Sequence, residues 1–180
     1  FILGHTDFKT LGSGRTDAKV SADDFAFELF VNEPFDCTKL LIRLNKELPS
    51  DIRAKSVQVV GDDFNIIQHS KIKEYHYYFS SGEKSHPFNA VLIRDFGATL
   101  NIERMQEAAF LFMGTHNFKR FASKSSVNTV FEREILLSVI EKNTRFVDAY
   151  TPTEAYVFKV KSKGFLRYQV RLMVGALVDV

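Results

Sequence analysis

The chain has 180 residues, 45% of them hydrophobic, which is enough to bury the core of one domain or of two small ones. Its formal net charge of +2 neither requires nor excludes a nucleic-acid partner. The single cysteine, Cys37, excludes an intrachain disulfide, and the five histidines are scattered rather than spaced as zinc ligands. The apolar tail after Val170 is interrupted by charges and is too short to span a bilayer. We therefore expect a soluble, cytoplasmic protein without a membrane segment or a metal site.

The N-terminal third of the chain predicts a small α+β layer. Residues 1–4 have the pattern of a last helical turn that ends at a glycine. Alternating apolar residues then predict strands over 8–11 and 25–29. Leucines at helical spacing predict a helix over 38–48, with a capping side chain at its start and a proline at its end. The β-branched run at 57–60 predicts another strand, and the helix would cover one face of the resulting sheet.

A glycine-rich loop over residues 12–20, with the sequence GSGRTDAKV, separates the first two predicted strands. Glycine tolerates backbone angles that other residues avoid, so the chain can bend sharply here. Such a bend would present Arg15 and Asp17 at the edge of a sheet rather than inside it. The loop lacks the Gly-Lys-Ser/Thr ending of a P-loop and the third glycine of the dinucleotide-binding fingerprint. Taken alone, Asp17 fits an ordinary turn carboxylate, which glycine-rich loops commonly contain.

The remainder of the chain predicts a second α+β layer. Residues 71–79 alternate, with Tyr75, Tyr77 and Phe79 on one face, and predict a strand. The polar stretch that follows it predicts a loop. Further along the chain we expect a helix over 101–114, strands over 135–139 and 156–160, and a final helix over 165–178.

Arg171 is the charged residue that stands out in the final predicted helix. Its neighbours leave this helix apolar nearly all round, so we expect the guanidinium to be at least partly buried. A buried cation needs a carboxylate or phosphate partner, because removing its water is costly. We expect Asp17 to be that partner and to be held ionised by it. The alternative is that Arg171 caps a carbonyl group or pairs with a surface acid such as Asp179.

Basic residues gather at three places, 71–73, 119–124 and 159–163, and the second is interleaved with aromatic and hydroxyl residues. A solvated surface accounts for any one of them. Together they favour a face that follows the phosphates of a nucleic acid. The eighteen phenylalanines are expected in sheet and helix cores, although some rings could instead stack on bases.

The loop at Asp17 resembles the signature of a known enzyme family. Residues 14–18, GRTDA, followed by Val20, resemble the GRTDAGV motif of the TruA family of tRNA pseudouridine synthases. The chain departs from the family at Lys19, where glycine is usual, and at Leu172, where a polar residue is common. Further matches follow in the family's order and cover nearly the whole chain: LN and LPSDI in 44–52, DDF at 62–64, YHY at 75–77, MGTHNF at 113–118, and FLRYQVR with VG in 165–175.

The resemblance implies an α+β fold of the pseudouridine synthase type, with two ferredoxin-like halves of mainly antiparallel sheet that meet at a central cleft. The first half would span residues 1–62 and carry the catalytic loop, and the second would span residues 63–180. Family members have an earlier strand and helix, and they continue beyond the last predicted helix with a pair of strands. We therefore expect this chain to be incomplete at both ends.

The resemblance also implies an isomerase that converts uridine to pseudouridine in the anticodon stem-loop of tRNA, at positions 38, 39 and 40. Asp17 would be the catalytic nucleophile, and Arg171 would lie beside it in the cleft. Tyr75 would pack against the target base, and its hydroxyl could take part in proton transfer. Arg15 would fill the space left by the extruded uridine or bind a flanking phosphate, and Phe165 would form an apolar wall of the pocket. The family implies a homodimer that binds tRNA and needs neither a cofactor nor a metal.

Simpler interpretations of the same residues stay open. Tyr75 fits an ordinary cross-strand tyrosine, and Phe165 fits a core aromatic at the start of a helix. The chain could be an RNA-binding module that does no chemistry, because ferredoxin-like sheets with exposed aromatic side chains bind single strands by stacking. A carboxylate-dependent hydrolase of a small nucleoside is a further alternative, although no second well-placed acid is evident.

Overall fold

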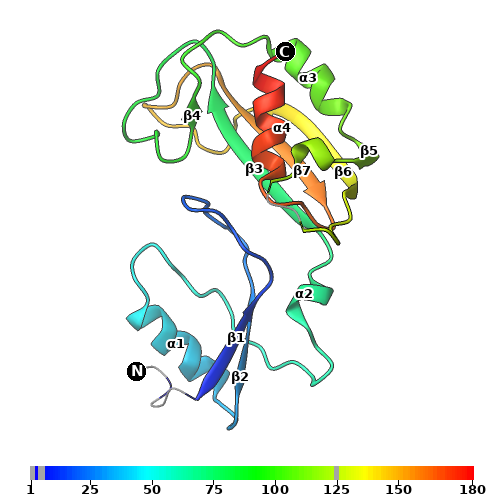
Figure 1. Ribbon diagram of the computed structural model, residues 1–180. Helices are drawn as coiled ribbons and strands as arrows, with labels where there is room; N and C mark the ends of the chain where they lie inside the picture. Colours follow the sequence, from blue (N-terminus) through cyan, green and yellow to red (C-terminus); the bar gives the residue numbers. More distant parts are fainter. Residues whose placement is uncertain (1–2, 4–6, 124–125) are drawn as a thin grey trace. The chain divides into compact units, whose positions relative to one another are not determined.

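The computed structural model describes residue 3, residues 7–123 and residues 126–180. It divides the chain into two compact units, residues 1–70 and 71–180, and each is described by itself (Figure 1). Residues 63–70, which the sequence-based division groups with the second half, belong to the first of these units. The helical turn predicted over residues 1–4 lies outside the described residues, apart from Leu3.

The first unit contains one antiparallel strand pair and two helices. β1 (Phe8–Gly12) pairs with β2 (Phe27–Val31), so that Gly12 lies opposite Phe27. α1 (Cys37–Glu47) begins at Asp36, whose side chain accepts a hydrogen bond from the backbone N–H of Lys39 at 3.0 Å. α2 (Ile66–His69) contacts β1, and its first backbone N–H donates to the carboxylate of Glu28 on β2. The two strands and the helix predicted at these places are confirmed.

The strand predicted over residues 57–60 is wrong. This segment has no regular secondary structure, and the side chain of Val59 is 84% exposed. A β-branched run favours extended backbone, but a strand also needs a neighbouring edge that supplies hydrogen bonds. In the described part of the first unit the sheet consists of β1 and β2, and residues 57–60 pair with neither. The sheet is therefore smaller than the sequence predicts.

The second unit is built on a five-stranded sheet with the strand order β4-β3-β7-β6-β5. Neighbouring strands are antiparallel except β3 and β4, which pair in parallel over a short length. The central order β3-β7-β6, with two helices, is that of a ferredoxin-like β-α-β-β-α unit. The predicted α+β class and mainly antiparallel sheet are thus confirmed. The elements are β3 (Lys73–Ser80), β4 (Arg94–Asp95), α3 (Ile102–Phe110), β5 (Gly114–Asn117), the 3-10 helix η1 (Lys119–Phe121), β6 (Glu132–Lys142), β7 (Ala155–Ser162) and α4 (Gln169–Val178).

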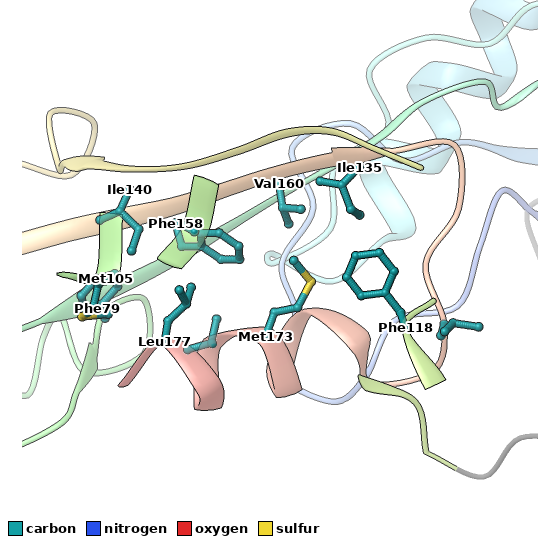
Figure 2. Close-up of a cluster of buried hydrophobic side chains, with 12 residues drawn as sticks. Phe79, Met105, Phe118, Ile135, Ile140, Phe158, Val160, Met173 and Leu177 are labelled. Atoms are coloured by element: carbon teal, nitrogen blue, oxygen red, sulfur yellow. The ribbon is translucent and has the colours of Figure 1, made fainter. Parts of the chain in front are cut away.

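The helices α3 and α4 share one hydrophobic core with the sheet of the second unit. Phe158 and Val160 of β7 are 1% and 0% exposed. They lie in one cluster with Met173 and Leu177 of α4 and with Met105 of α3 (Figure 2). Burying a large apolar side chain of this kind stabilises a fold by about 1.5–3 kcal/mol. The second unit therefore has a core made by its own elements.

A β-bulge in β6 changes which of its side chains face the core. The register shifts between Ile135 and Leu137, which inserts one extra residue into the strand. Ile135 is buried, and beyond the bulge the buried side chains are Ser138 and Ile140. A regular strand over 135–139, as the sequence predicts, would put Ile135, Leu137 and Val139 on one face, and this alternation fails beyond Ile135 because the bulge reverses it.

The final helix is shorter than the sequence predicts. α4 begins at Gln169 rather than at Phe165, because Tyr168 has a left-handed backbone with φ of 63°, which a continuous α-helix does not contain. The connection between β7 and α4 therefore carries Phe165 as a loop residue. Among the described residues, no helix combines the length and apolar character that crossing a bilayer requires.

Candidate functional site

The loop that carries Asp17 lies at the end of the β1–β2 pair. Beyond the last residue pair of the ladder, the backbone N–H of Ser13 donates to the carbonyl of Ala26 at 2.9 Å. Both ends of the loop are thus held by the strands, as the sequence predicts. Arg15 and Asp17 lie on this connection, and Arg15 is exposed. Connections held by a rigid scaffold commonly carry functional side chains.

Tyr75 and Phe165 meet in the second unit. Their ring centroids are 5.2 Å apart and their planes are inclined at 89°, an edge-to-face arrangement that aromatic pairs prefer. Tyr75 belongs to β3, where it lies opposite Val160 of β7, and both aromatic side chains border the hydrophobic core. Two residues that the sequence assigns to the site therefore form one aromatic surface.

Tyr77 lies two residues further along β3 and interacts electrostatically with two arginines. Burial raises the pKa of the Tyr77 phenol, and the positive charges of Arg94 and Arg171 act in the opposite direction. Arg94 belongs to β4, which is paired with the end of β3. The phenol of Tyr77 therefore stays protonated at neutral pH and can donate a hydrogen bond. The interaction also shows that the guanidinium of Arg171 lies near this part of β3.

Arg171 is exposed as a whole residue, and the expectation that its guanidinium is at least partly buried stays a prediction. The apolar residues Met173, Val174 and Leu177 form the buried side of α4. Arg171 falls outside this stripe, and so does Leu172, which is 39% exposed. Apolar neighbours in sequence predict burial of a charge only where the side of the helix that carries the charge is covered.

Gln169 is a buried polar residue at the start of α4. It is 1% exposed, and its side-chain oxygen accepts a hydrogen bond from the backbone N–H of Leu166 at 2.8 Å. Its own backbone N–H donates to the carbonyl of Leu166 at 3.1 Å. The side chain of Tyr168 does not cap the helix. Gln169 therefore fixes the segment in front of α4, which includes Phe165.

The predicted site residues offer three kinds of chemistry. The carboxylate of Asp17 can act as a nucleophile or a base, and the phenol of Tyr75 can donate or accept a proton. The guanidinium groups of Arg15 and Arg171 can bind a carboxylate or a phosphate. Among the described residues, no group of three or more His, Cys, Asp or Glu side chains is arranged to hold a metal ion.

Comparisons with known proteins agree on one family. Residues 108–180 match the family model described as tRNA pseudouridine synthase. The chain is 34% identical over 172 residues to tRNA pseudouridine synthase A 1 of Protochlamydia amoebophila (strain UWE25), a match that covers 94% of this chain and 64% of that protein. It is 33% identical over 170 residues to tRNA pseudouridine synthase A of Bacillus sp. (strain KSM-64), covering 94% of this chain and 66% of that protein. The chain belongs to the TruA family of tRNA pseudouridine synthases.

The match to TruA-family proteins extends over both units of the chain. A third relative, tRNA pseudouridine synthase A of Streptococcus pyogenes serotype M1, is 30% identical over 169 residues, covering 94% of this chain and 65% of that protein. The chain thus spans 64–66% of the length of these curated relatives. Since the match covers 94% of this chain, it includes most of the first unit, which contains the Asp17 loop.

The backbone beside Asp17 is left-handed at Lys19, a position where the TruA-family signature usually has glycine. The φ of Lys19 is 66°. This left-handed conformation suits glycine but costs a residue with a Cβ atom about 1–2 kcal/mol. The turn beside Asp17 is therefore less favourable with lysine at this position than it would be with glycine.

The two units of this TruA-family chain each contain part of the predicted site. Arg15 and Asp17 belong to the first unit, and Tyr75, Phe165 and Arg171 belong to the second. Within the second unit the structure brings the rings of Tyr75 and Phe165 into contact. It also brings the charge of Arg171 close to β3.

Sequence reasoning missed three residues that the structure adds to this region. Tyr77 has a visible signal, because it shares an alternating face with Tyr75. Gln169 has a weaker one, since a glutamine among apolar helix residues is a candidate for a buried hydrogen bond. Arg94 has none, because only the parallel pairing of β4 with β3 brings it near Tyr77.

Proposed function

We propose that the protein containing this chain isomerises uridine to pseudouridine in tRNA, with Asp17 as the nucleophile. The observation that carries the proposal is the ordered match to TruA-family proteins over 94% of the chain, which includes the GRTDA loop. The edge-to-face pair of Tyr75 and Phe165 supports it further, because a target base needs an aromatic surface once it leaves its stack.

The proposed reaction needs no change in oxidation state. The ionised carboxylate of Asp17 attacks an electrophilic carbon of uridine, either C6 of the ring or C1′ of the sugar. The bond between N1 and C1′ breaks, the uracil rotates, and its C5 forms the new bond to C1′ as the carboxylate leaves. The proton lost from C5 is balanced by the proton gained at N1. Substrate and product are therefore isomers, and no cofactor or metal takes part.

The other predicted residues have separate roles in this proposal. Tyr75 packs against the target base, and its hydroxyl is a candidate for moving the proton from C5. Phe165 forms the apolar wall that meets Tyr75 edge to face. Arg171 binds the carboxylate of Asp17 or a phosphate, a role that suits an exposed arginine near β3. Arg15 replaces the extruded uridine in the stack or binds a flanking phosphate.

We further propose that the target uridines are positions 38, 39 and 40 of the anticodon stem-loop. The proposed enzyme is a cytoplasmic homodimer in which both subunits bind one tRNA. These statements rest on the TruA-family resemblance.

Tritium release from C5 of uracil tests the reaction. The full-length protein should release tritium from labelled tRNA, and Asp17→Asn and Asp17→Ala should abolish release while they still bind tRNA. Asp24→Asn is a matched control, because Asp24 lies in the same loop and makes a surface ion pair of 3.7 Å with Lys55. Equal release by the wild-type and Asp17 variants would exclude Asp17 as the nucleophile. Binding of tRNA without release by the wild type would favour an RNA-binding module that does no chemistry.

A further inference from the structure

The sheet of the second unit has an outer surface on which lysines are paired with acids. Lys161 lies 3.1 Å from the carboxylate of Glu74, and Lys163 lies 3.6 Å from that of Glu134. Lys159 donates a hydrogen bond to Glu141, which raises the pKa of the lysine and keeps it charged. The basic cluster predicted at 159–163 is therefore largely neutralised by its neighbours. Its lysines have little net charge to offer to a nucleic acid.

The basic cluster that begins at Lys119 is held differently. Lys119 and Arg120 belong to η1 and are exposed. The turn is anchored by the rings of Phe112, Phe118 and Phe121, in which Phe121 contacts Phe112 at 5.3 Å and Phe118 at 5.8 Å between ring centroids. Phe118 is 2% exposed. The aromatic anchor thus fixes a short turn whose two cations face solvent, while Lys124 lies outside the described residues.

Arg167 joins the same surface from the connection in front of α4. The backbone N–H of Ser123 donates to the carbonyl of Arg167 at 3.1 Å, and η1 contacts α4. Arg167 is exposed, and its guanidinium lies over the ring of Tyr168 at 5.2 Å. Among the described residues, Lys119, Arg120 and Arg167 take part in no ion pair. Three uncompensated cations therefore lie on two segments that are hydrogen-bonded to each other.

We propose that Lys119, Arg120 and Arg167 form a phosphate-binding surface that holds the RNA backbone next to the Tyr75–Phe165 pair. The inference rests on the proposed function, since it takes RNA as the ligand. Guanidinium and ammonium groups without acidic partners bind phosphate oxygens and release counterions from the nucleic acid. Arg167 is two residues from Phe165 in the chain, so a strand bound here continues directly to the aromatic surface. The opposite surface, with its paired lysines, does not contribute.

The salt dependence of tRNA binding by the full-length protein tests this surface. The variant Lys119→Gln/Arg120→Gln/Arg167→Gln removes three charges and keeps side chains of similar length. The matched control is Lys159→Gln/Lys161→Gln/Lys163→Gln, which removes the same charge from the paired surface. An unmodified, fluorescently labelled tRNA transcript is titrated at several salt concentrations. Thermal unfolding checks that each variant is folded, and Arg120→Gln alone provides a milder variant because Arg120 makes no ring contact or ion pair among the described residues.

The expected result is a loss of slope in the plot of log affinity against log salt. The magnitude of this slope falls by about 0.7–0.9 for each lost phosphate contact. It should therefore fall by about 2–3 in the triple variant and by about 0.7–0.9 in Arg120→Gln. The control should keep the wild-type slope. An unchanged slope in the η1 variants, or an equal loss in the control, would overturn the proposal. If the η1 variants form pseudouridine normally and keep the wild-type slope, the phosphate-binding surface alone is rejected. If these variants lose slope but the wild type forms no pseudouridine, the catalytic proposal alone is rejected.

Discussion

The second unit buries a continuous apolar core, whereas the first unit leaves much of its apolar surface exposed. In the second unit, twelve buried apolar side chains from the sheet, α3, α4 and their connections form one cluster. In the first, Leu40 and Ile66 are the buried apolar residues among those described. Phe8 and Phe27 of the β1–β2 pair are 48% and 54% exposed. Both units contain strands with apolar residues, but they differ in what covers those strands.

The comparison shows that an alternating pattern predicts which segments pair as strands better than it predicts which side chains are buried. β1 and β2 pair as their sequences predict, and a two-stranded pair has little capacity to bury its own faces. β3, β6 and β7 pair in the same way, but α3 and α4 cover one face of their sheet (Figure 1). The covering layer of α3 and α4 turns the same kind of pattern into a core.

Truncating a phenylalanine to alanine should give the largest difference between the two units in lost stability. Phe158→Ala is expected to lower the free energy of unfolding of the second unit by about 3–5 kcal/mol, because it leaves a cavity in a fully buried site. Phe27→Ala in the first unit should cost less than about 1 kcal/mol, since its ring is more than half exposed. Urea denaturation followed by tyrosine fluorescence reports the second unit, and hydrogen exchange reports both. Similar losses for both variants would contradict the difference in burial.

Removing a side chain that accepts backbone N–H groups should have a smaller effect, again unequal between the units. Gln169→Ala should destabilise the second unit by about 1–2 kcal/mol, because the N–H of Leu166 loses its acceptor, while removal of the side-chain Nε2, which is buried without a hydrogen-bond partner among the described residues, offsets part of the loss. Asn65→Ala removes the cap of α2 in the first unit, where water can replace it, and should cost about 1 kcal/mol or less. Hydrogen exchange at Leu166 and at Ile67 measures the two effects. Equal protection losses would argue against the buried role of Gln169.

Replacing a left-handed residue by glycine should have unequal effects in the two units, at Lys19 in the first and at Tyr168 in the second. Lys19→Gly should raise the stability of the first unit by about 1 kcal/mol, since glycine adopts this conformation without a Cβ clash. Tyr168→Gly relieves the same strain in the second unit but removes the ring beneath Arg167 and should give no net gain. Thermal unfolding of each variant measures the difference. A destabilising Lys19→Gly would show that the lysine side chain makes a compensating contact.

Alkaline titration should give the smallest effect and concerns the second unit, which contains all six tyrosines. Burial and a hydrogen bond to Glu154 raise the pKa of Tyr156 to about 12. A phenol with a raised pKa contributes stability below its unfolded pKa of about 10, and this contribution is lost as the pH rises towards 12. Glu154→Gln should move the Tyr156 titration part of the way back to about 10, as measured by phenolate absorbance. A midpoint that stays near 12 in the variant would assign the whole shift to burial.

Local periodicity is why several elements could be predicted from the sequence. The alternation of β3 and the capped, amphipathic patterns of α1 and α3 depend on neighbours within a few residues. The short strands β4 and β5 could not be predicted, because strands of two and four residues are too short to show an alternating pattern. The run at 57–60 fails for the converse reason, since it has strand-like composition but pairs with neither strand of its unit. The bulge in β6 is likewise a property of the pairing with β7.

The candidate site divides in the same way. Asp17, Tyr75, Phe165 and Arg171 are identifiable because they lie in motifs that resemble the TruA family. The contact between Tyr75 and Phe165 needs β3 and the connection before α4 to pack together. The exposure of Arg171 likewise depends on which side of α4 is covered.

The sequence by itself determined the family and the main strands and helices, and it predicted the residues of the candidate site. The tertiary structure decided which side chains are buried, which rings touch and which cations are neutralised. The reason is that periodicity and motifs are encoded along the chain, whereas burial and charge compensation depend on the segment that packs opposite. The lysines at 159–163 and the cations at 119–120 both form short basic clusters in the sequence. They differ because acids of β3 and β6 pair with the first cluster and, among the described residues, not with the second.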